Sequence, residues 1–167
     1  LGVNPNGKNI NFECGSLFPH QAIATVEKTR ADIGICLDGD ADRVLVIDET
    51  GKIIDGDRLI GIIAKLLLDR GDLKPGDEVV GTVMSNLGLE IYLESIGLKF
   101  HRTKVGDRYI SEYLRKSGAV FGGEPSGHII FKNYSTTGDG VLSALKAIEA
   151  MKFYGKSLGE LTKDIPL

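Results

Sequence analysis

Residues 33–47, IGICLDGDADRVLVI, place a run of alternating carboxylates between two short apolar segments. Both segments are rich in β-branched residues and are bounded by polar or turn-forming residues, which is typical of strands. We therefore expect strands over Ile33–Leu37 and Val44–Ile47, joined by a polar loop. Three carboxylates share that loop: Asp38, Asp40 and Asp42.

The crowding of these carboxylates indicates a bound cation. Like charges a few ångströms apart repel, and a site that keeps them ionised normally contains a hard divalent cation with oxygen ligands. We interpret the loop as a magnesium site. A solvated acidic turn without metal is the simplest alternative.

An EF-hand calcium loop is the other alternative, because Glu49 follows the three aspartates at the spacing that motif uses. Its sixth position requires glycine for a sharp turn, whereas Arg43 stands there, and an EF-hand joins two helices rather than two strands. Arg43 itself has two interpretations. It either neutralises charge on a transferred phosphate or balances the surplus carboxylate.

The composition favours a soluble α/β protein of one or two domains. The chain has 167 residues, 42% of them hydrophobic, and 22 glycines. The net charge of −3 offers no basic stripe for nucleic acid, and the longest apolar stretch, residues 59–68, is too short to cross a bilayer. We expect a cytoplasmic protein with no nucleic-acid or membrane partner, and reduced, buried thiols at Cys14 and Cys36. Because the first residue is Leu1, we expect a fragment.

Helical and strand patterns alternate along the chain. Helical spacing appears over Pro19–Lys28 and again over Arg58–Asp69, for which Asp57 is the expected N-cap. The charged, turn-rich segment 70–77 is the expected domain boundary, giving domains over residues 1–73 and 74–167.

The second half repeats a β-α-β-α-β order. The expected strands are Glu78–Met84, Lys99–Thr103 and Ala119–Phe121, and the expected helices are Leu87–Ser95, Arg108–Lys116 and Val141–Tyr154. Such alternation predicts the α/β class, here two consecutive α/β domains with mixed, mostly parallel sheets flanked by helices. Binding loops then lie at the carboxyl ends of the strands.

Three polar loops follow these strands: Ser85–Asn86, Lys104–Arg108 and Gly122–His128. We expect them to meet at one edge of the sheet. In the last loop, Glu124, Ser126 and His128 alternate with smaller residues, so an extended backbone would project all three one way. An acid, a hydroxyl and an imidazole suit a ligand with several hydroxyl groups. For the loop 134–140 we expect mainly helix capping, through Asp139 or a threonine.

Together, Asp38–Arg43 and Gly123–His128 resemble the α-D-phosphohexomutase superfamily, in which the first segment is the metal loop and the second the sugar loop. Three further segments are similar to the bacterial phosphoglucosamine mutases: Thr82–Glu90, Lys104–Tyr109 and Thr136–Gly140. The likeness runs through essentially the whole chain. One departure is Pro125, which stands where that family generally has a polar residue.

The resemblance implies an enzyme that interconverts glucosamine 6-phosphate and glucosamine 1-phosphate, on the route to cell-wall amino sugars. A phosphoserine and a bisphosphate intermediate carry the phosphoryl group. The alternatives are a phosphomannomutase or phosphoglucomutase of the same superfamily, a sugar-phosphate-binding module without catalysis, and a metal-dependent phosphatase with an aspartate nucleophile.

The resemblance also implies a role for each site residue. Asp38, Asp40 and Asp42 bind Mg²⁺, and Arg43 positions the reacting phosphate. The others line the same cleft: Glu124 and Ser126 hold sugar hydroxyls, while Lys104, Asp107 and His128 orient the ligand or handle protons.

Four domains are usual in this superfamily, and the resemblance implies that this chain holds most of the second and the third. The serine loop belongs to the first domain and a phosphate-clamping loop to the last. The expected partners are therefore a phosphorylated hexosamine and the first and last domains of the same polypeptide. We expect the chain alone to be inactive.

Overall fold

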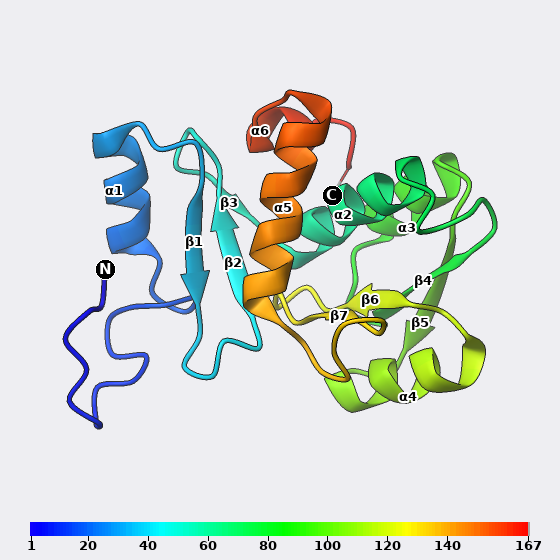
Figure 1. Ribbon diagram of the computed structural model, residues 1–167, viewed down its shortest axis with the longest axis horizontal. Helices are drawn as coiled ribbons and strands as arrows, with labels where there is room; N and C mark the ends of the chain where they lie inside the picture. Colours follow the sequence, from blue (N-terminus) through cyan, green and yellow to red (C-terminus); the bar gives the residue numbers. More distant parts are fainter. Residues whose placement is uncertain (167) are drawn as a thin grey trace.

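The computed structural model describes residues 1–166, in which helices and strands alternate around two sheets (Figure 1). The helices are α1 (His20–Thr29), α2 (Gly56–Asp69), α3 (Leu87–Ser95), α4 (Asp107–Ser117), α5 (Gly140–Tyr154) and α6 (Leu158–Leu161). The strands are β1 (Gly34–Leu37), β2 (Val44–Ile47), β3 (Ile53–Ile54), β4 (Glu78–Thr82), β5 (Lys99–Thr103), β6 (Phe121–Gly123) and β7 (Ile129–Phe131). The predicted α/β class is confirmed.

The smaller sheet is antiparallel, with the order β1-β2-β3. Its residues alternate between two faces, as strand geometry requires. Ile47 packs with Cys36 and Val26, a residue of α1, while Val44 and Val46 belong to the main core on the other face. Figure 1 shows α1 on one side of this sheet and α5 between the two sheets.

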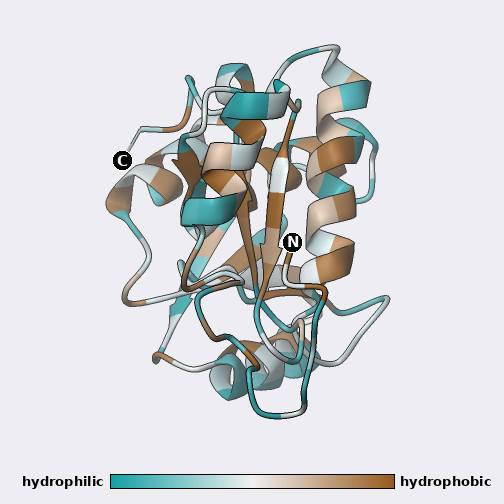
Figure 2. Cartoon of the chain, turned by 90° about the vertical axis from the view of Figure 1, so that its left-hand side faces the viewer, coloured by the Kyte–Doolittle hydropathy of each residue, from teal (hydrophilic) through white to brown (hydrophobic). Residues whose placement is uncertain are grey.

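The larger sheet has the order β5-β4-β6-β7 and is mostly parallel, as predicted. Strand β4 runs parallel to both β5 and β6, and only β7 is antiparallel to its neighbour. Helix α4 covers one face through Ile110 and Leu114, which pack on Val80. Val79 and Phe121 face the main core, which α2 and α3 share. Figure 2 shows the apolar colour concentrated along the strands and on the helix faces turned towards them.

The start of α2 differs from the prediction. Asp55, not Asp57, is the N-cap, because its extended backbone lets the carboxylate accept a hydrogen bond from the Arg58 amide at 2.9 Å. Asp57 lies buried in the first turn and accepts from the Asn86 amide at 2.8 Å. It therefore ties α2 to the start of α3 instead of capping its own helix.

The main core contains residues from both sides of the expected domain boundary. Val46 and Ile54 from the smaller sheet belong to the same buried cluster as Val79 and Phe121 from the larger one. The division after Leu73 stays a prediction. Among residues 1–166, no helix combines the length and apolar character needed to span a bilayer.

Candidate metal and ligand site

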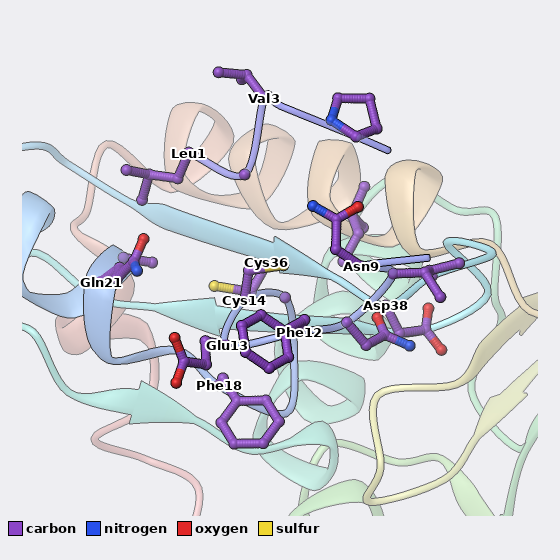
Figure 3. Close-up of a pocket in the computed structure, with 18 of the residues that line it drawn as sticks. Leu1, Val3, Asn9, Phe12, Glu13, Cys14, Phe18, Gln21, Cys36 and Asp38 are labelled. Atoms are coloured by element: carbon purple, nitrogen blue, oxygen red, sulfur yellow. The ribbon is translucent and has the colours of Figure 1, made fainter. Parts of the chain in front are cut away.

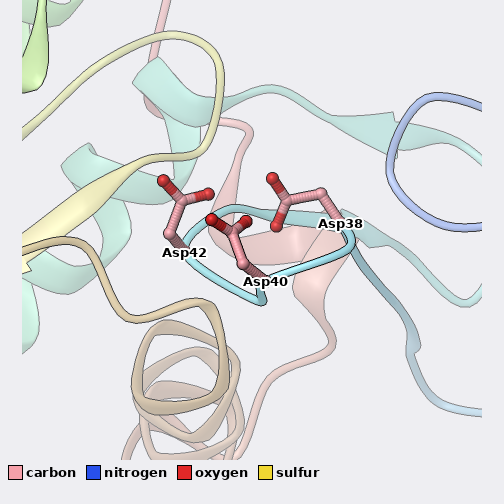
Figure 4. A group of neighbouring side chains, drawn as sticks. All are labelled: Asp38, Asp40 and Asp42. Atoms are coloured by element: carbon pink, nitrogen blue, oxygen red, sulfur yellow. The ribbon is translucent and has the colours of Figure 1, made fainter. Parts of the chain in front are cut away.

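The loop between β1 and β2 holds three carboxylates above one tight turn (Figure 4). The Ala41 amide donates to the Asp38 carbonyl at 3.2 Å, and the Arg43 amide donates to Asp38 Oδ1 at 3.1 Å. Ala41 has a left-handed φ of 59°, a conformation that costs a non-glycine residue about 1–2 kcal/mol. Its carbonyl accepts from the Gly140 amide at 2.9 Å, so the first residue of α5 helps to hold the turn.

The three side chains form a cluster that could hold a metal ion. Each of Asp38, Asp40 and Asp42 offers an oxygen atom within 4.8 Å of the others. Burial, together with the nearby carboxylates of the other two aspartates, raises the pKa of Asp42. The loop therefore concentrates negative charge that a cation would relieve.

The hydrogen-bond partners of the two Asp42 carboxylate oxygens indicate whether a cation fits. Oδ2 lies 3.1 Å from His128 Nδ1, whereas Oδ1 is buried and has no hydrogen-bond partner among residues 1–166. Arg43 Nε is 3.8 Å from that Oδ1, beyond hydrogen-bond distance. Two oxygens on one Mg²⁺ can be at most about 4.2 Å apart, which is close to the 4.8 Å within which the three oxygens lie. An unpartnered buried carboxylate oxygen among two further carboxylates fits an oxygen-binding cation.

The predicted sugar loop is a tight hairpin turn between β6 and β7, so the expectation of an extended backbone is wrong. The Gly127 amide donates to the Glu124 carbonyl at 3.0 Å, and the Glu124 amide donates to the His128 carbonyl at 2.9 Å. Pro125 occupies the second position of this turn, where its fixed φ is favourable. Gly127 follows with a φ of +85°. The departure at Pro125 is thus compatible with the local fold.

Backbone contacts join the acidic loop to this hairpin. The Val44 amide donates to the Gly127 carbonyl at 3.1 Å, and Arg43 and His128 form an isolated antiparallel bridge. The Gly56 amide, at the start of α2, donates to the Pro125 carbonyl at 3.1 Å. Segments more than 80 residues apart in the sequence are therefore fixed side by side.

A pocket of about 370 Å³ opens where these segments meet the loop before α4. Its lining residues are Asp42, Arg43, Val105, Gly106, Asp107, Glu124, Ser126 and His128. Six of the nine predicted site residues are among them. Asp38 and Asp40 lie in the adjoining loop. Lys104 is exposed outside the lining, with its Nζ 5.9 Å from the centre of the Tyr109 ring.

The lining residues differ in how accessible their side chains are to a ligand. Arg43 and Asp107 have side chains 48% and 56% exposed, and Ser126 is also exposed. Glu124 Oε1 accepts from the Gly106 amide at 3.0 Å, which links two of the predicted loops.

His128 is buried, with 1% of its surface exposed. Besides the contact with Asp42, its Nε2 accepts from the Gly138 amide at 3.0 Å. The sequence predicted the capping role of Asp139, which accepts from the Leu142 amide, but not the roles of Gly138 and Gly140. The glycines on both sides of Asp139 were the feature of the sequence that could have indicated these roles. Ser85 and Asn86, expected to join the other loops, do not line this pocket.

A larger hollow of about 880 Å³ lies between the N-terminal segment and β1 (Figure 3). Its lining is mainly apolar and amide side chains, and Glu13 and Asp38 supply its charged groups among the described residues. It lacks the converging polar groups that characterise a small-molecule site. The smaller pocket, beside the aspartates, is the better candidate.

Comparisons with known proteins show the family to which the chain belongs. The family model for phosphoglucomutase/phosphomannomutase α/β/α domain II matches residues 4–51, and that for α/β/α domain III matches residues 55–166. A phosphoglucosamine mutase from Nitratidesulfovibrio vulgaris (strain DP4) is 52% identical over the whole chain, which covers 37% of that protein. One from Solidesulfovibrio magneticus is 55% identical over 96% of the chain and 36% of its own length.

Solved structures show the same fold. A phosphoglucomutase/phosphomannomutase family protein from Burkholderia thailandensis superposes with a TM-score of 0.81 at 27% identity, covering 91% of this chain and 32% of that one. The chain spans somewhat more than a third of the length of the curated relatives it matches. Since the two family models together match nearly all of its residues, the chain belongs to the phosphoglucomutase/phosphomannomutase family.

Proposed function

We propose that this chain provides the metal loop and the sugar loop of a phosphoglucosamine mutase, which interconverts glucosamine 6-phosphate and glucosamine 1-phosphate. The relatives that bear this name are 52% and 55% identical to it. The observation that carries the proposal is the junction of the acidic loop and the Glu124–His128 hairpin beside one pocket. The serine that carries the phosphoryl group, and the loop that clamps the distal phosphate, would come from other domains of the protein.

The cation proposed for the acidic loop is Mg²⁺, with Asp38, Asp40 and Asp42 as its ligands. The oxygen-only donor set favours a hard cation, and Asp42 has one buried carboxylate oxygen without a hydrogen-bond partner among the described residues. When bound, the ion would supply positive charge that stabilises the transferring phosphoryl group.

The remaining residues would bind and orient the sugar phosphate. Arg43, half exposed next to the aspartates, would donate to phosphate oxygens. Glu124 and Ser126 would bind sugar hydroxyls, with the free Glu124 oxygen accepting and the Ser126 hydroxyl donating or accepting. Asp107 and Lys104 lie on the loop opposite and would orient the ligand at the rim.

A chimera tests this assignment without requiring the chain to act alone. This chain would replace the matching segment of the Nitratidesulfovibrio vulgaris relative, to which it aligns over its full length. We expect the chimera to convert glucosamine 6-phosphate in the presence of Mg²⁺, and the isolated chain to show no turnover. Asp40→Asn should reduce turnover by 100-fold or more, because a ligand charge is lost. Asp32→Asn is the matched control, since Asp32 is exposed in the turn before β1.

The outcome separates the proposed function from its alternatives. Preference for mannose or glucose phosphates over glucosamine phosphate would instead favour the other members of the superfamily. A correctly folded chimera that binds sugar phosphate but never turns it over would favour a binding module. A phosphoaspartate trapped at Asp38 or Asp40 would indicate a phosphatase. Equal turnover by the chimera and its Asp40→Asn variant would refute the assignment of Asp40 as a metal ligand.

A further inference from the structure

The smaller pocket carries more negative charge than a neutral sugar phosphate would call for. Three of its described lining residues have carboxylates, namely Asp42, Asp107 and Glu124, and Arg43 is the one arginine or lysine among them. The ligand proposed above already carries a phosphate, which carboxylates repel. A cation at the acidic loop would offset the charge of Asp42, but it would leave Asp107 and Glu124 without a positively charged partner.

The carboxylate of Asp107 is accessible and has no structural role in its own helix. Its side chain is 56% exposed at the first position of α4. Within residues 1–166, its one ion-pair contact is His128 Nε2 at 3.9 Å, which is beyond hydrogen-bond distance. In the first turn of α4, the Tyr109 amide donates to the Gly106 carbonyl at 3.0 Å and not to this carboxylate. Helix capping therefore does not account for Asp107.

The contact between two loops places Asp107 next to the proposed sugar-binding carboxylate. Glu124 Oε1 accepts a hydrogen bond at 3.0 Å from the amide of Gly106, the residue immediately before Asp107. In glucosamine the amino group is on a ring carbon adjacent to a carbon that carries a hydroxyl group. A sugar that offers this hydroxyl to Glu124 can therefore offer its ammonium group to a second carboxylate close by.

We propose that Asp107 determines specificity by binding the ammonium group of a 2-amino sugar phosphate. This inference rests on the proposed function and names the group that selects its substrate. Glucose phosphate has a hydroxyl of similar size at the same position, so the difference between the two sugars is mainly one of charge. An ammonium donates a charge-assisted hydrogen bond to a carboxylate, which is roughly twice as strong as a neutral one.

The test compares two sugars in the chimera described above. The kcat/KM is measured for glucosamine 6-phosphate and for glucose 6-phosphate, in the parent chimera and in its variants. Asp107→Asn keeps the size and an acceptor oxygen but removes the charge. We expect it to lower kcat/KM for glucosamine 6-phosphate by about 10-fold or more, and to leave that for glucose 6-phosphate within about threefold. Asp107→Glu keeps the charge and should retain more of the preference than Asp107→Asn.

Glu112→Gln is the matched control for the loss of one negative charge from α4. Glu112 is on the same helix, with a side chain 40% exposed and paired with Lys116, and it does not line the pocket. This variant should leave both kcat/KM values unchanged. Because Asp107 is half exposed, added salt should weaken its attraction for an ammonium group. The preference of the parent for glucosamine 6-phosphate should therefore fall as the ionic strength rises, whereas that of Asp107→Asn should not.

Two results would overturn the role of Asp107. A ratio of the two kcat/KM values that changes less than threefold in Asp107→Asn would show that this carboxylate does not select the amino sugar. Equal losses for both sugars would show that Asp107 acts through His128 or through the stability of α4. Circular dichroism checks that each variant is folded.

Failure of this inference differs from failure of the proposed function. If the chimera prefers glucosamine 6-phosphate and Asp107→Asn keeps the same preference, the proposed function stands and the role of Asp107 is refuted. If the parent chimera turns over neither sugar, or prefers glucose 6-phosphate, the proposed function fails and the role of Asp107 fails with it.

Discussion

Gly127→Ala should destabilise the chain through the contact between the Glu124–His128 hairpin and β2. An added Cβ at Gly127 would lie 1.9 Å from the Val44 carbonyl oxygen, a backbone atom that cannot swing aside as a flexible side chain can. The hairpin must move away, which breaks the hydrogen bond from the Val44 amide to the Gly127 carbonyl. Gly118→Ala is the matched control, because its φ of +87° is close to the +85° of Gly127 and an added Cβ would meet nothing within 4 Å.

The two variants share the cost of a left-handed alanine, about 1–2 kcal/mol. Gly127→Ala adds a lost hydrogen bond worth about 0.5–1.5 kcal/mol, together with the clash. We therefore expect it to lower the free energy of unfolding by at least about 1 kcal/mol more than Gly118→Ala does. With a urea slope of about 2 kcal/mol/M, the two unfolding midpoints should differ by about 0.5 M or more. Equal midpoints at equal slopes would refute the claim that the Gly127–Val44 contact fixes the two loops together.

Two further predictions concern buried or capping aspartates. Burial raises the pKa of Asp57 above its ordinary value of 3.8. The contribution of Asp57 to the free energy of unfolding is therefore complete below pH 3.8 and is lost as the pH rises through the raised pKa. Asp57→Asn should therefore gain stability relative to the parent as the pH rises above 3.8, and a difference in urea midpoints that is the same at every pH would contradict this. Asp139→Ala should lower the free energy of unfolding by about 1 kcal/mol because the cap on the Leu142 amide is lost, whereas Asp139→Asn should retain most of it. Equal losses in these two variants would argue against the capping role.

Much of the fold could be predicted because local patterns specify it. The bounds expected for Leu87–Ser95 and Lys99–Thr103 are those of α3 and β5. The elements that were missed are short: β3 has two residues, β7 three and α6 four. Segments of this length cannot display a periodicity of 2 or 3.6 residues, and their pairing depends on partners elsewhere in the chain.

The candidate site could be predicted by residue type but not by contact. The motifs indicated that the acidic loop, the Glu124–His128 hairpin and the loop before α4 meet, but the expectation that Ser85–Asn86 joins them was wrong. The contact between His128 and Asp42 joins residues 86 positions apart. Nothing in the local sequence shows that the Gly138 amide donates a hydrogen bond to Nε2 of that histidine. The N-cap of α2 illustrates the same limit, because Asp55 and Asp57 are both chemically suitable caps and only the extended backbone of Asp55 selects between them.

The acidic loop Asp38–Asp42 has crowded side chains on a backbone that hydrogen bonds hold in place. The Gly140 amide holds the Ala41 carbonyl, and the loop therefore lies at the N-terminus of the 15-residue helix α5. The positive end of a helix dipole stabilises nearby carboxylates by about 0.3–1 kcal/mol, which offsets only part of the repulsion among three of them. Burial raises the pKa of Asp42, and the neighbouring carboxylates of Asp38 and Asp40 raise it further. Because the turn is already fixed by backbone hydrogen bonds, a cation would relieve this repulsion without first having to order the loop, and little of its binding free energy would be lost to conformational entropy.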